Sequence, residues 1–147
     1  MQTFDVRRIR SNLEDSYAWV SLWFRGDGRQ LEPLHIVCQR EAQGGRLSKF
    51  DTVYLERNDQ AVACYGGAKQ IVVGEGSIEV RLNRAGVKAL GLSPSFVLAV
   101  PEGLAGWQKA RRVFRDMTAY PTGRAIKVAE RGAAADGGGM YRGKGTS

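Results

Sequence analysis

The segment DTVYLERNDQAVACYGG (51–67) constrains the fold more than any other part of this chain. Apolar residues alternate with polar or amphipathic ones from Val53 to Glu56, which is the period of a half-buried strand. The alternation breaks at an Asn-Asp-Gln segment (58–60), resumes, and stops at a pair of glycines. Asn and Asp side chains bond to their own backbone and tolerate turn geometry, so the segment predicts a β-hairpin.

Several other segments have the composition or alternation of strands. Tyr17–Phe24 is the strongest of them, because it is rich in aromatic and β-branched residues. A tight glycine turn at 74–76 predicts a second hairpin between 71–73 and 78–82. The remaining strands are expected at 4–9, 34–39 and 96–100.

Two helices are expected late in the chain. Asn83 is a suitable N-cap for a short helix at Arg84–Leu90, with Gly91 in the C′ position. A longer amphipathic helix is expected from Pro101 to about residue 116. Hairpin-linked strands followed by helices, without a βαβ pattern, predict an α+β fold. Its mainly antiparallel sheet would be built of hairpins, with the short helix and the C-terminal amphipathic helix on one face.

Residues 1–120 are expected to form a single α+β domain, and residues 121–147 a basic Gly/Ala-rich tail. The tail has five Lys or Arg against two acidic residues, so it contributes three of the net charge of +7. Its last sixteen residues include six glycines and three alanines. Such a segment cannot offset its ordering entropy by burial, so it is expected to be disordered. Truncation after Tyr120 is accordingly expected to leave stability nearly unaltered.

The composition favours a protein that stays in the cytoplasm and has no membrane partner. No apolar run approaches the roughly 18–20 residues of a membrane span, and the N-terminus has no apolar signal region. Cys38 and Cys64 are expected to be buried free thiols, which would pair only if their strands were neighbours in register. His35 is expected to be a hydrogen-bonded strand residue. One His and two separated Cys do not have metal-site spacing, so neither a metal nor a cofactor is expected.

The residues offer little material for catalysis. Glu56 and Asp59 suggest a general acid and base, but carboxylates beside a turn are mostly solvated or capping groups. An enzyme with a small-molecule substrate is therefore not expected. A basic nucleic-acid-binding domain is the alternative, because the pI is about 9.8 and basic residues cluster at 7–10 and 109–115. However, the aromatic residues of 17–24 lie in the strand that looks most buried, so no stacking platform is expected.

Three segments carry a resemblance to a known family. Residues 54–60 read YLERNDQ, Tyr-Gly-Gly follows at 65–67, and a strand ends in IEVRL at 78–82 before the two helices. In this order and spacing they resemble the Imm10 family, immunity proteins of bacterial polymorphic toxin systems, over about residues 52–117. The first 50 residues fit in general shape only. The resemblance implies a protein that performs no reaction. Such a protein binds a cognate toxin domain made by the same cell and blocks it until the toxin reaches a competitor.

The expected contact surface is the rim of the hairpin, where polar or amphipathic side chains stand on a stiff support. The candidate partner-binding residues are Tyr54, Glu56, Asn58, Asp59, Gln60 and Tyr65. Turn chemistry is an alternative explanation for Asn58 and Asp59, and a strand end for Tyr65. The basic body disfavours inhibition of a nuclease by mimicry of nucleic acid. Either the toxin surface is acidic or the contact lies away from the toxin's active site, and the toxin's chemistry stays open.

Overall fold

The structure is a computed structural model that describes residues 1–26, 28, 30–42 and 52–129. Its strands are β1 (Gln2–Leu13), β2 (Tyr17–Phe24), β3 (Glu32–Gln39), β4 (Tyr54–Arg57), β5 (Ala63–Tyr65), β6 (Ala68–Val73), β7 (Ser77–Leu82), β8 (Ser95–Ala99) and β9 (Ile126–Val128). Its helices are α1 (Arg84–Leu90), α2 (Trp107–Thr118) and the 3-10 helix η2 (Pro121–Gly123). None of these helices is long and apolar enough to cross a membrane.

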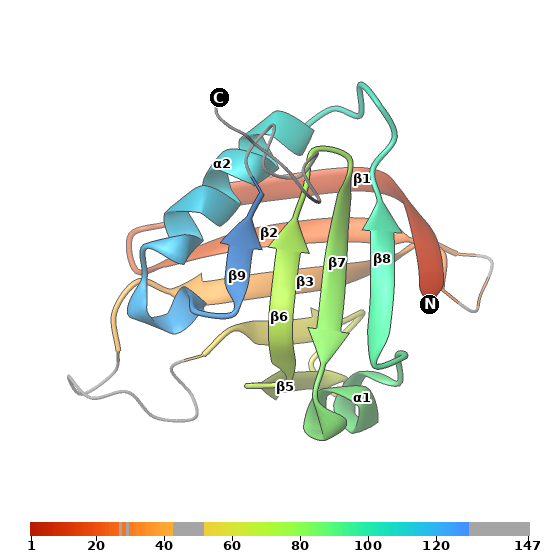
Figure 1. Ribbon diagram of the computed structural model, residues 1–147, viewed down its shortest axis with the longest axis horizontal. Helices are drawn as coiled ribbons and strands as arrows, with labels where there is room; N and C mark the ends of the chain where they lie inside the picture. The colour runs from red at the N-terminus through yellow and green to blue at the C-terminus, as the bar shows by residue number, and fades with distance from the viewer. Residues whose placement is uncertain (27, 29, 43–51, 130–147) are drawn as a thin grey trace, which may run out of the picture.

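The nine strands form one sheet in the order β5-β4-β3-β2-β1-β8-β7-β6-β9. β1 joins its two halves, because Gln2–Asp5 pair in parallel with β8 and Val6–Leu13 pair antiparallel with β2. β6 and β9 are the other parallel pair, and the remaining neighbours are antiparallel. Figure 1 shows the sheet folded at β1 into two layers, with β6–β9 crossing in front of β2–β5.

The apolar faces of the two layers pack against each other and form one core. In β2, every second residue is buried, from Ala18 to Phe24. β7 shows the same alternation, with Ile78, Val80 and Leu82 buried. These residues belong to a single hydrophobic cluster. Strand alternation therefore determines which side chains enter the core of a two-layer sandwich.

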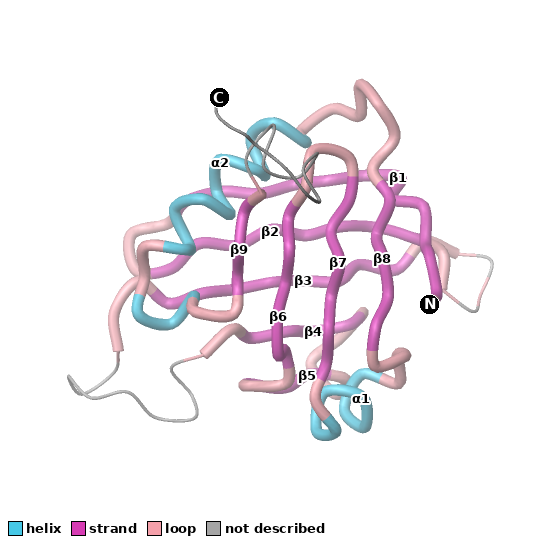
Figure 2. The backbone as a smooth tube through the Cα atoms, viewed as in Figure 1, coloured by secondary structure: helices cyan, strands magenta, loops and turns pink. Residues whose placement is uncertain are grey.

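The helices close the open sides of this sandwich instead of lying together on one face of a sheet. α2 packs against β1, β2 and β9, whereas α1 packs against β5 and β7. Figures 1 and 2 show the two helices at opposite ends of the molecule. This differs from the expected arrangement because each layer already buries its apolar face against the other. The helices instead cover the two ends of the sandwich, where the core would otherwise be exposed to water.

The C-terminal helix begins later than its sequence suggests. α2 starts at Trp107, whereas the expected helix started at Pro101. Gly103 and Gly106 have φ angles of 81° and 89°, in the left-handed region that a right-handed helix cannot include. The indole nitrogen of Trp107 donates to the carbonyl oxygen of Glu75 at 2.6 Å. The helix start is thus tied to the turn between β6 and β7.

Residues 121–129 continue the fold past the expected domain boundary at residue 120. In η2, Thr122 is buried, and its hydroxyl donates to the carbonyl oxygen of Gln39 in β3. β9 then pairs in parallel with β6, and Ile126 is buried. A strand of three residues has no detectable period, so tertiary contacts and not a local pattern define it. The rest of the expected tail, residues 130–147, lies outside the described residues.

Arg111 ties α2 to the end of β9. The sequence placed this residue outside the apolar stripe of the helix, yet its side chain is buried. Its Nη2 atom donates to the carbonyl oxygen of Ala129 at 3.1 Å. The nucleic-acid alternative counted Arg111 in the basic cluster at 109–115, but its buried side chain is not available to contact a phosphate.

The two cysteines do not lie on neighbouring strands. Cys38 in β3 is buried, Cys64 in β5 is half-buried, and both are free. β4 lies between these strands in the sheet. Burial raises the pKa of the Cys38 thiol to about 12, although a hydrogen bond with Thr122 acts in the opposite direction. Cys38 is a thiol of the core and not a reactive group.

Candidate functional site

The turn between β4 and β5 accounts for two of the six candidate residues. Asn58 has a φ angle of 69°, in the left-handed region that Asn tolerates better than most residues. Its backbone nitrogen donates to the carbonyl oxygen of Pro33 at 2.9 Å. The Asp59 carboxylate accepts from the backbone nitrogen of Ala61 at 2.8 Å, which is an Asx turn. Both side chains are exposed, and both are explained by the geometry of the turn.

Tyr54 and Tyr65 lie side by side on the outer face of the layer formed by β1–β5. They are register partners, and their ring centroids lie 4.8 Å apart at an interplanar angle of 51°. Val37 and Trp19 continue the same cross-strand row through β3 and β2. Tyr65 stands at the edge with 43% of its surface exposed. Cross-strand pairing thus assembles a continuous row of mostly aromatic side chains.

This row borders an open hollow of about 520 Å³, called here the tyrosine hollow. Its described lining residues are Tyr17, Val37, Gln39, Thr52, Tyr54, Glu56, Gln60 and Tyr65. The fold therefore brings together four of the six candidate residues. Asn58 and Asp59 are not among the lining residues, and Asn58 borders a separate hollow beside the end of α1.

Tyr54 fixes the position of the Glu56 carboxylate. The phenol hydroxyl donates to Oε1 of Glu56 at 2.8 Å. Burial, and then the neighbouring carboxylate, raise the pKa of Tyr54 to about 12. The phenol therefore stays neutral over the physiological pH range and remains a hydrogen-bond donor to Glu56.

The same outer face carries aromatic residues that the sequence placed in the core. Trp19 and Trp23 alternate with the buried residues of β2 and are only partly buried. The guanidinium of Arg8 lies over the ring of Trp23, 5.0 Å from its centroid. Tyr17 is 37% exposed. The sequence contained part of the signal, because aromatic and aliphatic residues alternate along β2, but this alternation does not say which set faces the other layer. Together with Tyr54 and Tyr65, these three residues form what is called here the aromatic face.

The outer face of the second layer has a different composition. Its outward side chains in β6–β9 are polar or aliphatic, and they include Gln70, Val72, Ser77, Glu79, Arg81, Ser95, Val97, Ala99 and Lys127. None of these described residues is aromatic. The aromatic face is thus a property of one layer and not of the exposed sheet in general.

Ser21, His35 and Glu56 form a polar network on the aromatic face. Ser21 Oγ lies 2.6 Å from Nδ1 of His35, and Nε2 of His35 lies 4.0 Å from Oε2 of Glu56. A hydroxyl, an imidazole and a carboxylate also make up hydrolase triads, but Ser21 is only 2% exposed. Glu56 and Asp59 bond to different partners and do not face one site. These contacts hold the side chains in fixed positions on the aromatic face. The described residues contain no group of His, Cys, Asp and Glu suited to a metal.

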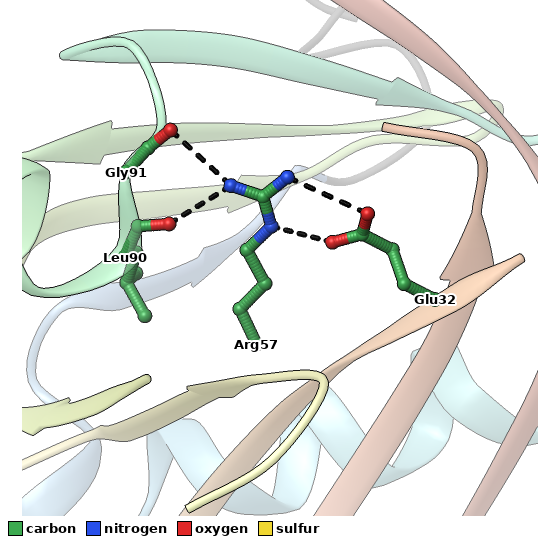
Figure 3. Close-up of polar contacts among 4 residues, drawn as sticks. All are labelled: Glu32, Arg57, Leu90 and Gly91. Atoms are coloured by element: carbon green, nitrogen blue, oxygen red, sulfur yellow. Dashed lines mark hydrogen bonds and ion pairs between the residues drawn. The ribbon is translucent and has the colours of Figure 1, made fainter. Parts of the chain in front are cut away.

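Arg57, the last residue of β4, links this strand to β3 and to the C-terminal end of α1. Its Nε donates to Oε1 of Glu32 at 2.5 Å, and its Nη1 donates to the carbonyl oxygens of Leu90 and Gly91 at 2.9 and 3.2 Å (Figure 3). The last carbonyls of a helix have no intrahelical donor, so Arg57 satisfies two groups that α1 leaves open. This residue of the YLERNDQ segment is therefore explained by the fold.

The Tyr-Gly-Gly segment fastens the other end of α1. Gly66 has a φ angle of 69°, and its carbonyl oxygen accepts from the Asn83 side chain at 2.6 Å. Asn83 also caps α1 by accepting from the backbone nitrogen of Gly86 at 2.9 Å. A Cβ atom on Gly67 would lie 2.8 Å from the Cα of Gly86, so only glycine permits this approach. The motifs behind the family resemblance thus join α1 to the hairpin.

A sequence model of the family described as Immunity protein 10 matches residues 15–104. The match covers more than half of the chain, and the chain belongs to this family. The matched segment begins much earlier than the expected 52–117, since it includes β2 and β3, and it ends before α2. Comparisons with curated proteins and with solved structures find no match. The family suggests a role in binding a toxin and not in catalysis.

Proposed function

We propose that this protein is an antidote of a bacterial polymorphic toxin system. It binds a cognate toxin domain in the cytoplasm of the producing cell and blocks it by protein–protein contact. Family membership supports the class of function. The observation that carries the proposal is the aromatic face, because Trp, Tyr and Arg dominate the binding energy of protein interfaces. The aromatic face has five partly exposed or exposed aromatic residues and Arg8 over the ring of Trp23. The outer face of the other layer has no aromatic residue among those described, so the aromatic face is the better candidate for a protein contact.

The proposed contact is centred on the tyrosine hollow. Its contact residues are Tyr54, Glu56, Gln60 and Tyr65 at the centre, with Asn58 and Asp59 at the neighbouring turn. Side chains held on paired strands lose little freedom on binding, which favours tight association. A standard interface buries roughly 1,600 Å² in total, so the contact would extend from the hollow across the aromatic face.

Co-expression with a candidate toxin domain from the genomic neighbourhood of this protein tests the proposal. The wild-type chain is expected to restore growth and to form a 1:1 complex on size exclusion. Tyr65→Ala is expected to weaken binding at least about tenfold, because Tyr65 is an exposed aromatic anchor of the hollow. Arg81→Ala, on the opposite layer, is the control and should bind within about twofold of wild type. If the two proteins do not associate, the function is wrong; if Tyr65→Ala binds normally, the surface is wrong.

One observation favours nucleic-acid binding as a second candidate. Arg8 stacks on Trp23, and Arg10 pairs with Ser21 on the same face, so basic and aromatic groups do lie together. Single-stranded nucleic acid binds such surfaces by stacking and by phosphate contacts. Titration with a mixed-sequence DNA oligonucleotide should then quench tryptophan fluorescence and weaken steeply with salt. No quenching at about 50 mM salt would remove this candidate.

A further inference from the structure

The tyrosine hollow combines aromatic walls with a negative charge. Tyr17, Tyr54 and Tyr65 contribute three rings, and Glu56 contributes the carboxylate. No described lining residue is a lysine or an arginine, although the chain as a whole has a net charge of +7. Among the described lining residues, the charged side chain is therefore a carboxylate, on a chain whose net charge is positive.

Glu56 differs from other strand glutamates in its ion pairing. Glu32 pairs with Arg57 and Glu79 pairs with Arg81, both of which carry a permanent charge. Within the described part of the chain, the ion-pair partner found for Glu56 is the His35 imidazole at 4.0 Å, which is charged only when protonated. The side chain of Glu56 is 17% exposed, so its charge is partly withdrawn from water without a permanent counter-charge. The attraction between this carboxylate and a cation of the partner is stronger here than it would be in open water, because the effective dielectric is lower.

We propose that the tyrosine hollow receives a cationic side chain, an arginine or a lysine, from the partner protein. This inference rests on the proposed function and specifies the chemistry of the toxin surface that enters the site. A cation is attracted to the faces of the aromatic rings and forms a charge-assisted hydrogen bond with the carboxylate. The hydroxyl of Tyr54 holds Oε1 of Glu56 at 2.8 Å, so the acceptor is oriented before the partner arrives.

The size and position of the hollow agree with this occupant. Its volume of about 520 Å³ is enough for a long side chain, and it is open, with Tyr65 the most exposed of its tyrosines. A cationic side chain that enters the hollow would meet the Glu56 carboxylate at the centre of the contact, so the net positive charge of the chain would not oppose it there. In this proposal the electrostatic contact with the toxin is made by the single oriented carboxylate of Glu56, and the net positive charge of the chain plays no part in it.

Glu56→Gln is the decisive variant, because glutamine can still accept the Tyr54 hydrogen bond but has no charge. Titration calorimetry with the toxin domain should show at least about a tenfold loss of affinity. Glu79→Gln is the matched control on the opposite layer and should bind like wild type. A double-mutant cycle with each basic contact residue of the toxin changed to Gln should find one residue whose effect disappears in Glu56→Gln. If wild type binds and Glu56→Gln binds within about twofold of it, the cationic anchor is wrong while the antidote function stands.

A second measurement does not depend on the toxin. N-acetyl-arginine amide, titrated to about 50 mM, should shift the NMR ring signals of Tyr54 and Tyr65, whereas the uncharged analogue N-acetyl-citrulline amide should not. Glu56→Gln should abolish these shifts. If the toxin fails to bind, the proposed function is wrong and this titration alone decides the inference. Shifts that are absent, or equal for the two compounds, would then overturn it.

Discussion

Arg57 offers the sharpest test of how the fold is held together. Replacing it with Met keeps much of the apolar stem but removes every donor, which leaves the Glu32 carboxylate unpaired and two carbonyls of α1 open. The side chains of Arg57 and Glu32 are only 14% and 16% exposed. Breaking a fully buried pair costs about 3–5 kcal/mol, so breaking this mostly buried pair should lower the free energy of unfolding by about 2–4 kcal/mol. Urea unfolding followed by tryptophan fluorescence measures the change.

The pair of Arg81 and Glu79 supplies a matched control within the same sheet. Its Nη2 and Oε2 atoms lie 3.2 Å apart, but the side chains are 54% and 31% exposed. Arg81→Met should therefore cost at most about 1 kcal/mol. Arg57→Lys should fall between wild type and Arg57→Met, since an ammonium cannot reach a carboxylate and two carbonyls with a fixed fork. If Arg57→Met and Arg81→Met prove equally mild, the joint between the hairpin and α1 contributes no stability, and this account of the motif is refuted.

Two further predictions concern the C-terminal segment and pH. Truncation after Tyr120 removes buried Ile126 and the pairing of β9, so it should lower the free energy of unfolding by about 3–5 kcal/mol. Truncation after Ala129 keeps these interactions, so this variant should unfold like the full chain. Equal urea midpoints for the two variants would contradict the role of β9. The folded pKa values of Cys38 and Tyr54 are raised to about 12 from 9.0 and 10.0, so their contribution is complete below about pH 9 and is lost as the pH rises towards 12. Urea midpoints should fall from pH 8 to 11, less steeply in Cys38→Ala, and a flat profile would show that neither group is shielded.

The features that the sequence predicted well depend on interactions within a few residues. The hairpin turn at 58–60 follows from side chains that bond to their own backbone. α1 occupies the expected range because Asn83 and Gly91 satisfy its ends locally. The start of α2 was misjudged, since Pro101 suits a first helical turn but the left-handed glycines that follow it do not. Glycine adopts positive and negative φ angles about equally well, so the sequence does not say where the helix begins, and the structure was needed to place this boundary.

The candidate site was predictable in part, because the positions of some of its residues follow from the local strand pattern. Tyr54 and Glu56 share a face because side chains alternate along a strand, and Tyr65 lies on the same face as the register partner of Tyr54. That Gln60 joins them at the hollow, while Asn58 and Asp59 do not, depends on how the turn bends relative to β3. The aromatic residues of β2 were missed because composition marks a strand but does not say which of its sides meets the other layer.

The turn of the β4–β5 hairpin and the caps of the short helix depend on residues close together in the sequence, so the sequence alone determines them. Other features exist only once distant surfaces meet: the fold of the sheet at β1, the recruitment of β9 beside β6, and the exposure of Trp19 and Trp23. The physical reason is one of range. Backbone hydrogen bonds and turns are satisfied by near neighbours, whereas burial is decided by which apolar faces are covered by elements far away in the sequence. The binding surface proposed for this immunity protein is what remained uncovered when the two layers closed.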